Sequence, residues 1–197
     1  MIAVVSCVAY RKVPFTWAPI AVDTWRVCVA WIALSVLIGW ASGIDALVTW
    51  GGRSEMVPNT AICLAMLTLA ALIRSRHRGD EGMRHVSHGL ALCVIVVAGL
   101  VLSGLGPSMD SVIHAYQMRP GSSILQPGRM GPGTAGALVA MALGIVGTSR
   151  RPIRVTLGYV AVLLAALGTL HDGRTAIPTF VAIFLLSGAS IMDRRYV

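Results

Sequence analysis

Two histidines stand three residues apart in RSRHRGDEGMRHVSH, residues 74–88, and this spacing is the clearest candidate for metal chemistry in the chain. His85 and His88 would share one face of a helix, where they could ligate a metal ion or a haem. Closed metal sites usually need about four ligands, and no second cluster lies nearby in the sequence. Contact with water or headgroups is therefore the favoured interpretation, and the same holds for His114 and His171.

The other reactive side chains are scattered along the chain. The cysteines form no CxxC pair, so their spacing does not indicate a disulfide or an iron–sulfur site. Lys12 is the only lysine and lies outside every long apolar run, which excludes a buried Schiff base. Paired carboxylates, a phosphate loop and a nucleophile beside a base are not recognisable in the sequence. We therefore predict a protein that is not an enzyme and that holds no cofactor and no metal.

The composition indicates a membrane protein. The chain has 56% hydrophobic and 12% charged residues, with a mean hydropathy of +0.77, whereas soluble domains carry about 25% charged residues. The net charge of +8 is not accompanied by a long basic run or a stacking aromatic series, so nucleic acid is not an expected partner. Membrane lipids are the expected surroundings.

Six apolar runs approach the roughly 20 residues that a transmembrane helix needs. We predict an all-α fold, an integral membrane six-helix bundle, with a cytoplasmic interfacial lead-in at 1–24 broken at Pro14 and Pro19. A cytoplasmic tail is expected at 193–197. The predicted spans are about 25–43, 59–74, 87–105, 132–148, 154–170 and 175–192.

Three of these spans begin with a related pattern of proline and threonine. Proline is tolerated in a first helical turn because its missing N–H would have no helical partner there. Threonine can cap the free amides of the same turn. The helix-start motif consists of Met56, Pro58 and Thr60, then Met130, Pro132 and Thr134, and in a degraded form Pro178 and Thr179.

This repetition predicts three helical hairpins, each with an acidic residue in its outer loop. A long outer loop at 106–131 separates the helices of the second hairpin, and a short helix is expected within it at about 108–118. The hairpins cover about 25–74, 87–148 and 154–192.

The distribution of arginine and lysine predicts the orientation of the chain. With both termini in the cytoplasm, 12 of the 16 basic residues lie inside, as the positive-inside rule requires. The four on the other side would be Arg53, Arg119, Arg129 and Arg174. We therefore expect a multi-pass protein of the bacterial inner membrane.

Small residues at four-residue spacing form a stripe in the fourth span. Gly136, Ala140 and Gly144 would lie on one helix face, where they would allow another helix to approach closely. We take this stripe as the candidate packing interface with a partner protein. The alternative is that it only closes the bundle of the chain itself.

Two segments that carry the repeat resemble the N-terminal membrane regions of bacterial sensor histidine kinases and diguanylate cyclases. They are GIDALVTWGGRSEMVPNTAICLAMLTLAAL, residues 43–72, and QPGRMGPGTAGALVAMALGIVG, residues 126–147. Gly133 stands where the first copy has Asn59. In those proteins a PAS, kinase or cyclase domain follows, and none is expected after Val197. The resemblance implies a sensory input region without its output domain.

Two functions are compatible with these features. The first is a non-catalytic sensory or regulatory membrane module that acts through helix contacts with another integral membrane protein. The alternative is a structural accessory subunit of a larger respiratory or photosynthetic complex. Neighbouring genes for a kinase or cyclase would favour the first, and an operon of complex subunits would favour the second.

The predicted topology is testable by thiol labelling of intact cells. Cysteines introduced at Ser54, Ser122 or Gly173 should react with an impermeant reagent from the outside, whereas those at Ser75 or Ser149 should be protected, because the basic residues hold these segments inside. The reverse labelling pattern would overturn the orientation.

Overall fold

The computed structural model of the chain describes residues 18–50, 56–77, 79–105, 130–147, 151–172 and 177–192. Within these ranges the protein has seven helices and no strand, which confirms the prediction of an all-α fold. The helices are α2 (Ala18–Ser42), α3 (Asp45–Thr49), α4 (Pro58–Arg76), α5 (Glu81–Leu102), α7 (Pro132–Val146), α8 (Arg151–Asp172) and α9 (Ile177–Met192).

Three of the helices are long and apolar enough to cross a membrane. These segments are Val22–Ser42, Pro58–Arg76 and Glu81–Leu102. The other apolar helical segments are shorter, and the 15 residues of α7 extend about 22 Å at a rise of about 1.5 Å per residue, against about 30 Å for a hydrocarbon core. The structure thus supports membrane association through three candidate spans, where the sequence predicted six.

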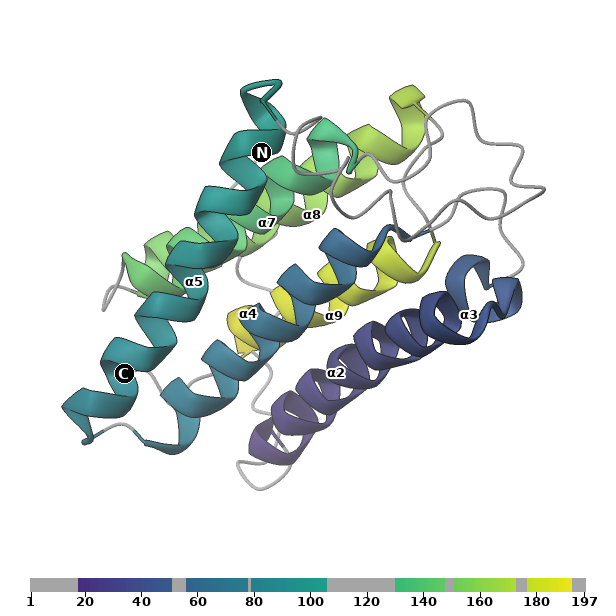
Figure 1. The fold of residues 1–197 in the computed structure, drawn as a ribbon. Coiled ribbons are helices and arrows are strands. Elements are labelled where there is room, and N and C mark those ends of the chain that lie inside the picture. Colours follow the sequence, from purple (N-terminus) through teal and green to yellow (C-terminus); the bar gives the residue numbers. More distant parts are fainter. Residues whose placement is uncertain are drawn as a thin grey trace.

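The six longer helices lie side by side in an elongated bundle (Figure 1). Each of them packs against the next in the order α2, α4, α5, α7, α8, α9, and α9 returns to pack against α2. Helices α4, α7 and α9 also contact one another. The core therefore lies along these three helices and contains buried aliphatic side chains such as Leu64, Leu138 and Ile183.

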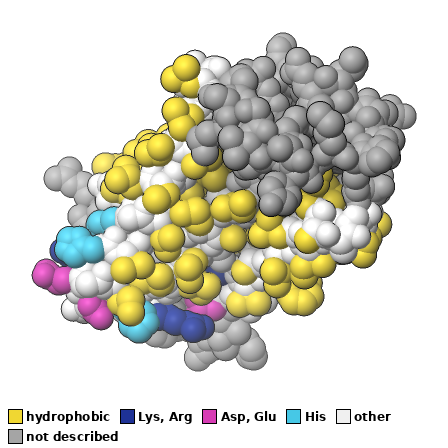
Figure 2. Space-filling model, in the orientation of Figure 1, with side chains coloured by type: hydrophobic (Ala, Val, Ile, Leu, Met, Phe, Trp, Pro, Cys, Tyr) yellow, Lys and Arg dark blue, Asp and Glu magenta, His cyan; other side chains and the backbone are white. Residues whose placement is uncertain are grey.

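The charged side chains that the structure describes lie at one end of this bundle. Among the residues whose side chains are described, the charged ones belong to the start of α2, the end of α4, the short turn after it and the start of α5. They are Asp23, Arg26, Arg74, Arg76, Asp80, Glu81 and Arg84. Figure 2 shows such groups gathered at one end, with hydrophobic side chains over much of the remaining described surface. We refer to this end as the charged end.

The proline and threonine motifs do mark helix starts, but threonine does not act as a cap. Pro58 and Pro132 each occupy the first turn of their helix, while the N-cap residues are Val57 and Gly131, with no side-chain cap. Thr60, two residues beyond Pro58, is buried inside the bundle instead. The first copy of the motif is held by Trp40, whose Nε1 donates to the carbonyl of Met56 over 2.8 Å.

The remaining motif residues are also placed mainly inside the chain. Met56, Met130, Pro58, Thr134, Pro178 and Thr179 are buried, and Pro132 is exposed. These residues therefore pack the interior of the bundle near the starts of α4, α7 and α9.

Two helices, α2 and α5, begin well before the predicted spans. Helix α2 starts at Ala18 and includes Pro19 in its first turn, so this proline does not break the helix. Helix α5 starts within the basic segment because the Asp80 side chain accepts hydrogen bonds from the amides of Gly82 and Met83, at 2.9 and 3.2 Å. Much of that segment is helix rather than loop.

The short helix α3 was not predicted. It follows Gly43, whose φ of 80° suits glycine, and it packs against α2. The short helix expected at 108–118 lies outside the described residues.

Close helix contact is clearest where α2 meets α9. A Cβ atom added to Gly188 would lie 2.5 Å from Cζ3 of Trp25, so this glycine allows the indole ring to pack on the α9 backbone. Gly89 in α5 differs, because a Cβ atom there would meet nothing within 4 Å.

This contrast gives a matched pair of substitutions. Gly188→Ala should destabilise the protein by about 1–3 kcal/mol, since the indole ring must move to avoid the new methyl group. Gly89→Ala should be neutral or stabilise by up to about 1 kcal/mol through helix propensity. Thermal unfolding in detergent measures both changes, and equal stability of the two variants would contradict the packing described here.

Candidate functional site: an arginine pocket at the charged end

A small, partly open cavity lies between five helices at the charged end. Its polar lining comes from Arg26 of α2, Arg74 of α4, and Ser187 and Ser190 of α9, and α7 and α8 contribute small and apolar residues. The cavity measures about 20 Å³, which is room for one water molecule or one ligand oxygen. We refer to it as the arginine pocket.

Arg26 is the most unusual residue of the pocket because it is charged and only 1% exposed. It lies four residues into the apolar segment that starts at Val22. Its Nη1 is 3.2 Å from Oδ1 of Asp23, whose side chain is 32% exposed. Its Nε is buried and makes no hydrogen bond. A buried guanidinium is costly to desolvate and is kept only where the surroundings compensate it or a function needs it.

Arg74 enters the pocket from the last turn of α4, where a cation also interacts favourably with the helix dipole. Its Nη1 lies 3.5 Å from Nε2 of His88 in α5. Arg74 therefore lines the pocket and contacts a neighbouring helix that does not line it.

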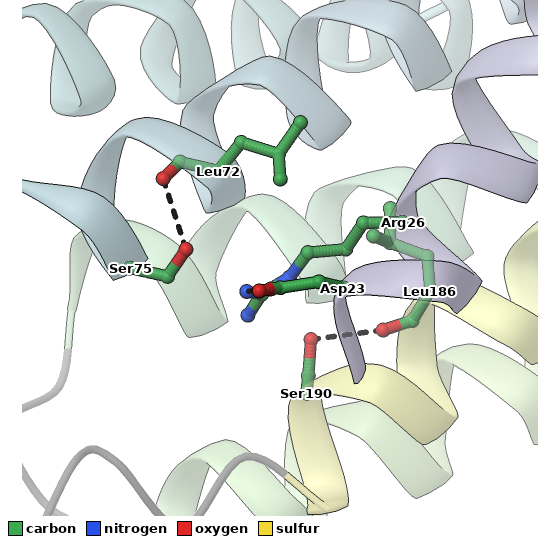
Figure 3. A network of polar contacts seen from close by, with 6 residues as sticks. All are labelled: Asp23, Arg26, Leu72, Ser75, Leu186 and Ser190. Atoms are coloured by element: carbon green, nitrogen blue, oxygen red, sulfur yellow. Dashed lines mark hydrogen bonds and ion pairs between the residues drawn. The ribbon is translucent and has the colours of Figure 1, made fainter. Parts of the chain in front are cut away.

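The hydroxyl groups around the pocket differ in their hydrogen bonds. Ser190 Oγ donates to the carbonyl of Leu186 over 2.9 Å, whereas Ser187 Oγ is buried and makes no hydrogen bond. Figure 3 shows the Arg26 side chain and Asp23 in the region between the α4 turn that carries Ser75 and the α9 turn that carries Ser190. The described lining thus combines two guanidinium groups, from α2 and α4, with two hydroxyl groups from α9.

The histidines predicted as possible ligands do not form a metal centre in the described part of the chain. His85 is exposed, and His88 is partly buried beside Arg74. No group of three or more His, Cys, Asp or Glu side chains able to hold a metal ion occurs among the described residues. His114 and the His171 side chain lie outside the described part.

The candidate packing stripe of the fourth span lies inside the chain. Ala140 is 6% exposed and Gly144 is buried, and both line the arginine pocket. A Cβ atom on Gly136 would lie 3.2 Å from Cδ1 of Leu164 in α8. The stripe is therefore occupied within the protein, because α7 packs between α5 and α8 and also contacts the other two core helices.

Sequence reasoning missed the pocket because it treated Arg26 only as a marker of topology. Two signals were available. One was an arginine within an apolar helix, three residues after an aspartate. The other was the pair Ser187 and Ser190 on one face of an otherwise apolar helix.

No protein-family model, curated protein or solved structure matches this chain. The resemblance to membrane regions of sensor kinases and cyclases therefore stays a prediction, and the function has to be argued from the geometry.

Two ion pairs among the described residues have the same sequence spacing but differ in burial. Asp23→Asn should destabilise the protein by about 1–3 kcal/mol, because the buried Arg26 guanidinium loses its contact with the charged Asp23 carboxylate. Glu81→Gln should cost less than about 1 kcal/mol, because Glu81 and its partner Arg84 are 81% and 53% exposed. Thermal unfolding at low salt measures both, and a cost for Glu81→Gln as large as that for Asp23→Asn would contradict this ranking.

Proposed function

We propose that the protein is a six-span integral membrane module, sensory or regulatory rather than catalytic, that acts through helix contacts with a partner membrane protein. On this proposal it resides in a bacterial inner membrane with both termini in the cytoplasm. The charged end then faces the cytoplasm, as the distribution of basic residues in the sequence predicts.

The arrangement of the helices supports six spans organised as three hairpins. Helices α2 and α4, α5 and α7, and α8 and α9 pack as consecutive pairs. The shorter helices α7 and α9 belong to the group that contacts one another in the core. Because protein surrounds much of their surface, their length needs to match the bilayer less closely than that of a lipid-facing helix.

The proposed contact with a partner protein is supported by the outward surface of α5. This helix combines the highest mean hydropathy of the three candidate spans, 2.2, with the smallest buried share, 22%. Its outward surface, which we call the α5 face, consists of Gly89, Leu92, Cys93, Val96 and Gly99.

No packing contact within the described part of the chain requires glycine at the two glycine positions of this face. A Cβ atom on Gly89 or Gly99 would meet nothing within 4 Å, unlike one on Gly188. Glycine within a helix costs up to about 1 kcal/mol relative to alanine. Helices in lipid associate through close packing of small residues, since no hydrophobic effect drives them together. A partner helix seated on the α5 face would give both glycines a role.

A structural accessory subunit would use the same surface. The identity of the bound protein separates the two functions, because a kinase or cyclase partner indicates regulation and a complex of electron-transfer subunits indicates a structural role.

Bulky substitutions on the α5 face test the proposal. Gly89→Leu and Cys93→Leu should each reduce recovery of the partner after mild extraction by tenfold or more, about 1.4 kcal/mol of lost contact, because the added side chain separates the two backbones. The unfolding temperature of the chain itself should not fall, since space is open at Gly89 and Cys93 is exposed.

Cys28→Leu is the matched control, because Cys28 is also an exposed cysteine in an apolar span but lies on α2. It should leave partner recovery unchanged. Equal recovery from all variants would remove the support for the α5 face as the contact surface.

A further inference from the structure

We propose that the arginine pocket binds an oxygen of a phosphate group, and that the position of the pocket favours the headgroup of an anionic phospholipid as its source. This inference rests on the membrane location in the proposed function but not on the partner contact. The chemistry is that of a phosphate oxyanion held by two guanidinium groups and serine hydroxyls.

The first support is the unusual state of Ser187. A serine in a helix usually satisfies its hydroxyl by donating to a nearby backbone carbonyl. The other serines whose side chains are described all donate to a backbone carbonyl, and they are Ser35, Ser42, Ser75, Ser87, Ser103 and Ser190. Ser187 is the exception, being 0% exposed with no hydrogen-bond partner for its Oγ. When a buried hydroxyl has no hydrogen-bond partner and lines a cavity, it indicates that a hydrogen-bond acceptor from another molecule occupies that cavity.

The second support is the charge around that hydroxyl. Arg26 and Arg74 line the same cavity, and its described lining contains no acidic side chain. The Asp23 carboxylate, which contacts the Arg26 guanidinium, is not part of this lining. Guanidinium groups recognise phosphate through strong charge-assisted hydrogen bonds. The lining therefore favours an anionic acceptor over a neutral one.

The third support is size and position. The cavity of about 20 Å³ is partly open, so it suits one inserted phosphate oxygen while the rest of the group stays at the mouth. Trp25, beside Arg26, packs on Gly188, beside Ser187. Tryptophan is enriched at membrane boundaries, and basic pockets between spans on the cytoplasmic side bind anionic headgroups.

An ordered water molecule is the competing occupant. Water would also satisfy Ser187 Oγ, but it carries no charge. It would therefore respond neither to anionic lipid nor to the loss of the Arg74 charge.

The experiment uses the full chain in nanodiscs of phosphatidylcholine, with and without phosphatidylglycerol, and native mass spectrometry to count retained lipid. Arg74→Gln and Ser187→Ala should each reduce phosphatidylglycerol retention about tenfold, as expected for the loss of one charge-assisted hydrogen bond. The controls are Arg76→Gln and Ser75→Ala, because Arg76 is exposed in the same helix turn and neither residue lines the pocket. Both controls should retain the lipid as the parent does.

Ser187→Ala separates a binding role from a structural one. In phosphatidylcholine alone this variant should unfold at the same or a higher temperature than the parent, because it removes a buried hydroxyl without a partner. The rise in unfolding temperature caused by phosphatidylglycerol should be lost in it. If Arg74→Gln fails to fold, lipid retention by Ser187→Ala alone decides whether the pocket binds the phosphate group.

Titration with inorganic phosphate in detergent identifies the source. Stabilisation by phosphatidylglycerol but not by inorganic phosphate assigns the site to a lipid headgroup, and stabilisation by both assigns it to a phosphate group of either origin. The proposal is overturned if neither stabilises the parent, or if Ser187→Ala retains the lipid as the controls do, and the occupant is then water. Partner recovery by the α5 face variants is measured separately, so the two proposals fail independently.

Discussion

A guanidinium buried in an apolar bundle is the constraint on which the charged end depends. Arg26 is 1% exposed within an apolar helix, so its charge has to be compensated locally. Asp23 provides one partner from the preceding turn. Small residues on the neighbouring helices, among them Gly144 and Gly158, line the same cavity as Arg26. The same small residues leave the cavity that makes this end of the bundle a candidate site.

Close backbone approach holds the rest of the bundle together. In lipid, apolar side chains gain little from contact with one another, so stability depends on packing and on satisfied hydrogen bonds. The indole ring of Trp25 packs against the backbone at Gly188. The Nε1–H of Trp40 donates a hydrogen bond to the carbonyl of Met56. Tryptophan thus joins α2 to α9 near one end and to the start of α4 near the other.

Local features of the sequence predicted most helix positions, whereas the sequence did not show which face of each helix meets which neighbour. Pro58 and Pro132 marked helix starts because the first helical turn tolerates a residue without an N–H. The earlier start of α5 was not predicted, but the sequence contains a signal for it, since Asp80 is a favourable N-cap residue. Periodicity placed Gly136 on one face of α7, but only the three-dimensional order of the helices showed that this face meets α8. The sequence shows that Arg26 lies in an apolar helix three residues after an aspartate, but its burial involves four other helices, and their arrangement was not predicted.

The arginine pocket and the α5 face lie on different helices, yet one residue connects them. Arg74 lines the pocket, and its Nη1 lies 3.5 Å from Nε2 of His88, one residue before Gly89 on α5. An anion that draws the Arg74 guanidinium into the pocket changes its distance from His88. Such a contact transmits a signal only if the anion binds two arrangements of α5 with different affinities, and the partner must then affect anion binding by the same factor. Reciprocal dependence of the two binding events is therefore the physical signature that a sensory module of this architecture must have and that a purely structural subunit does not need.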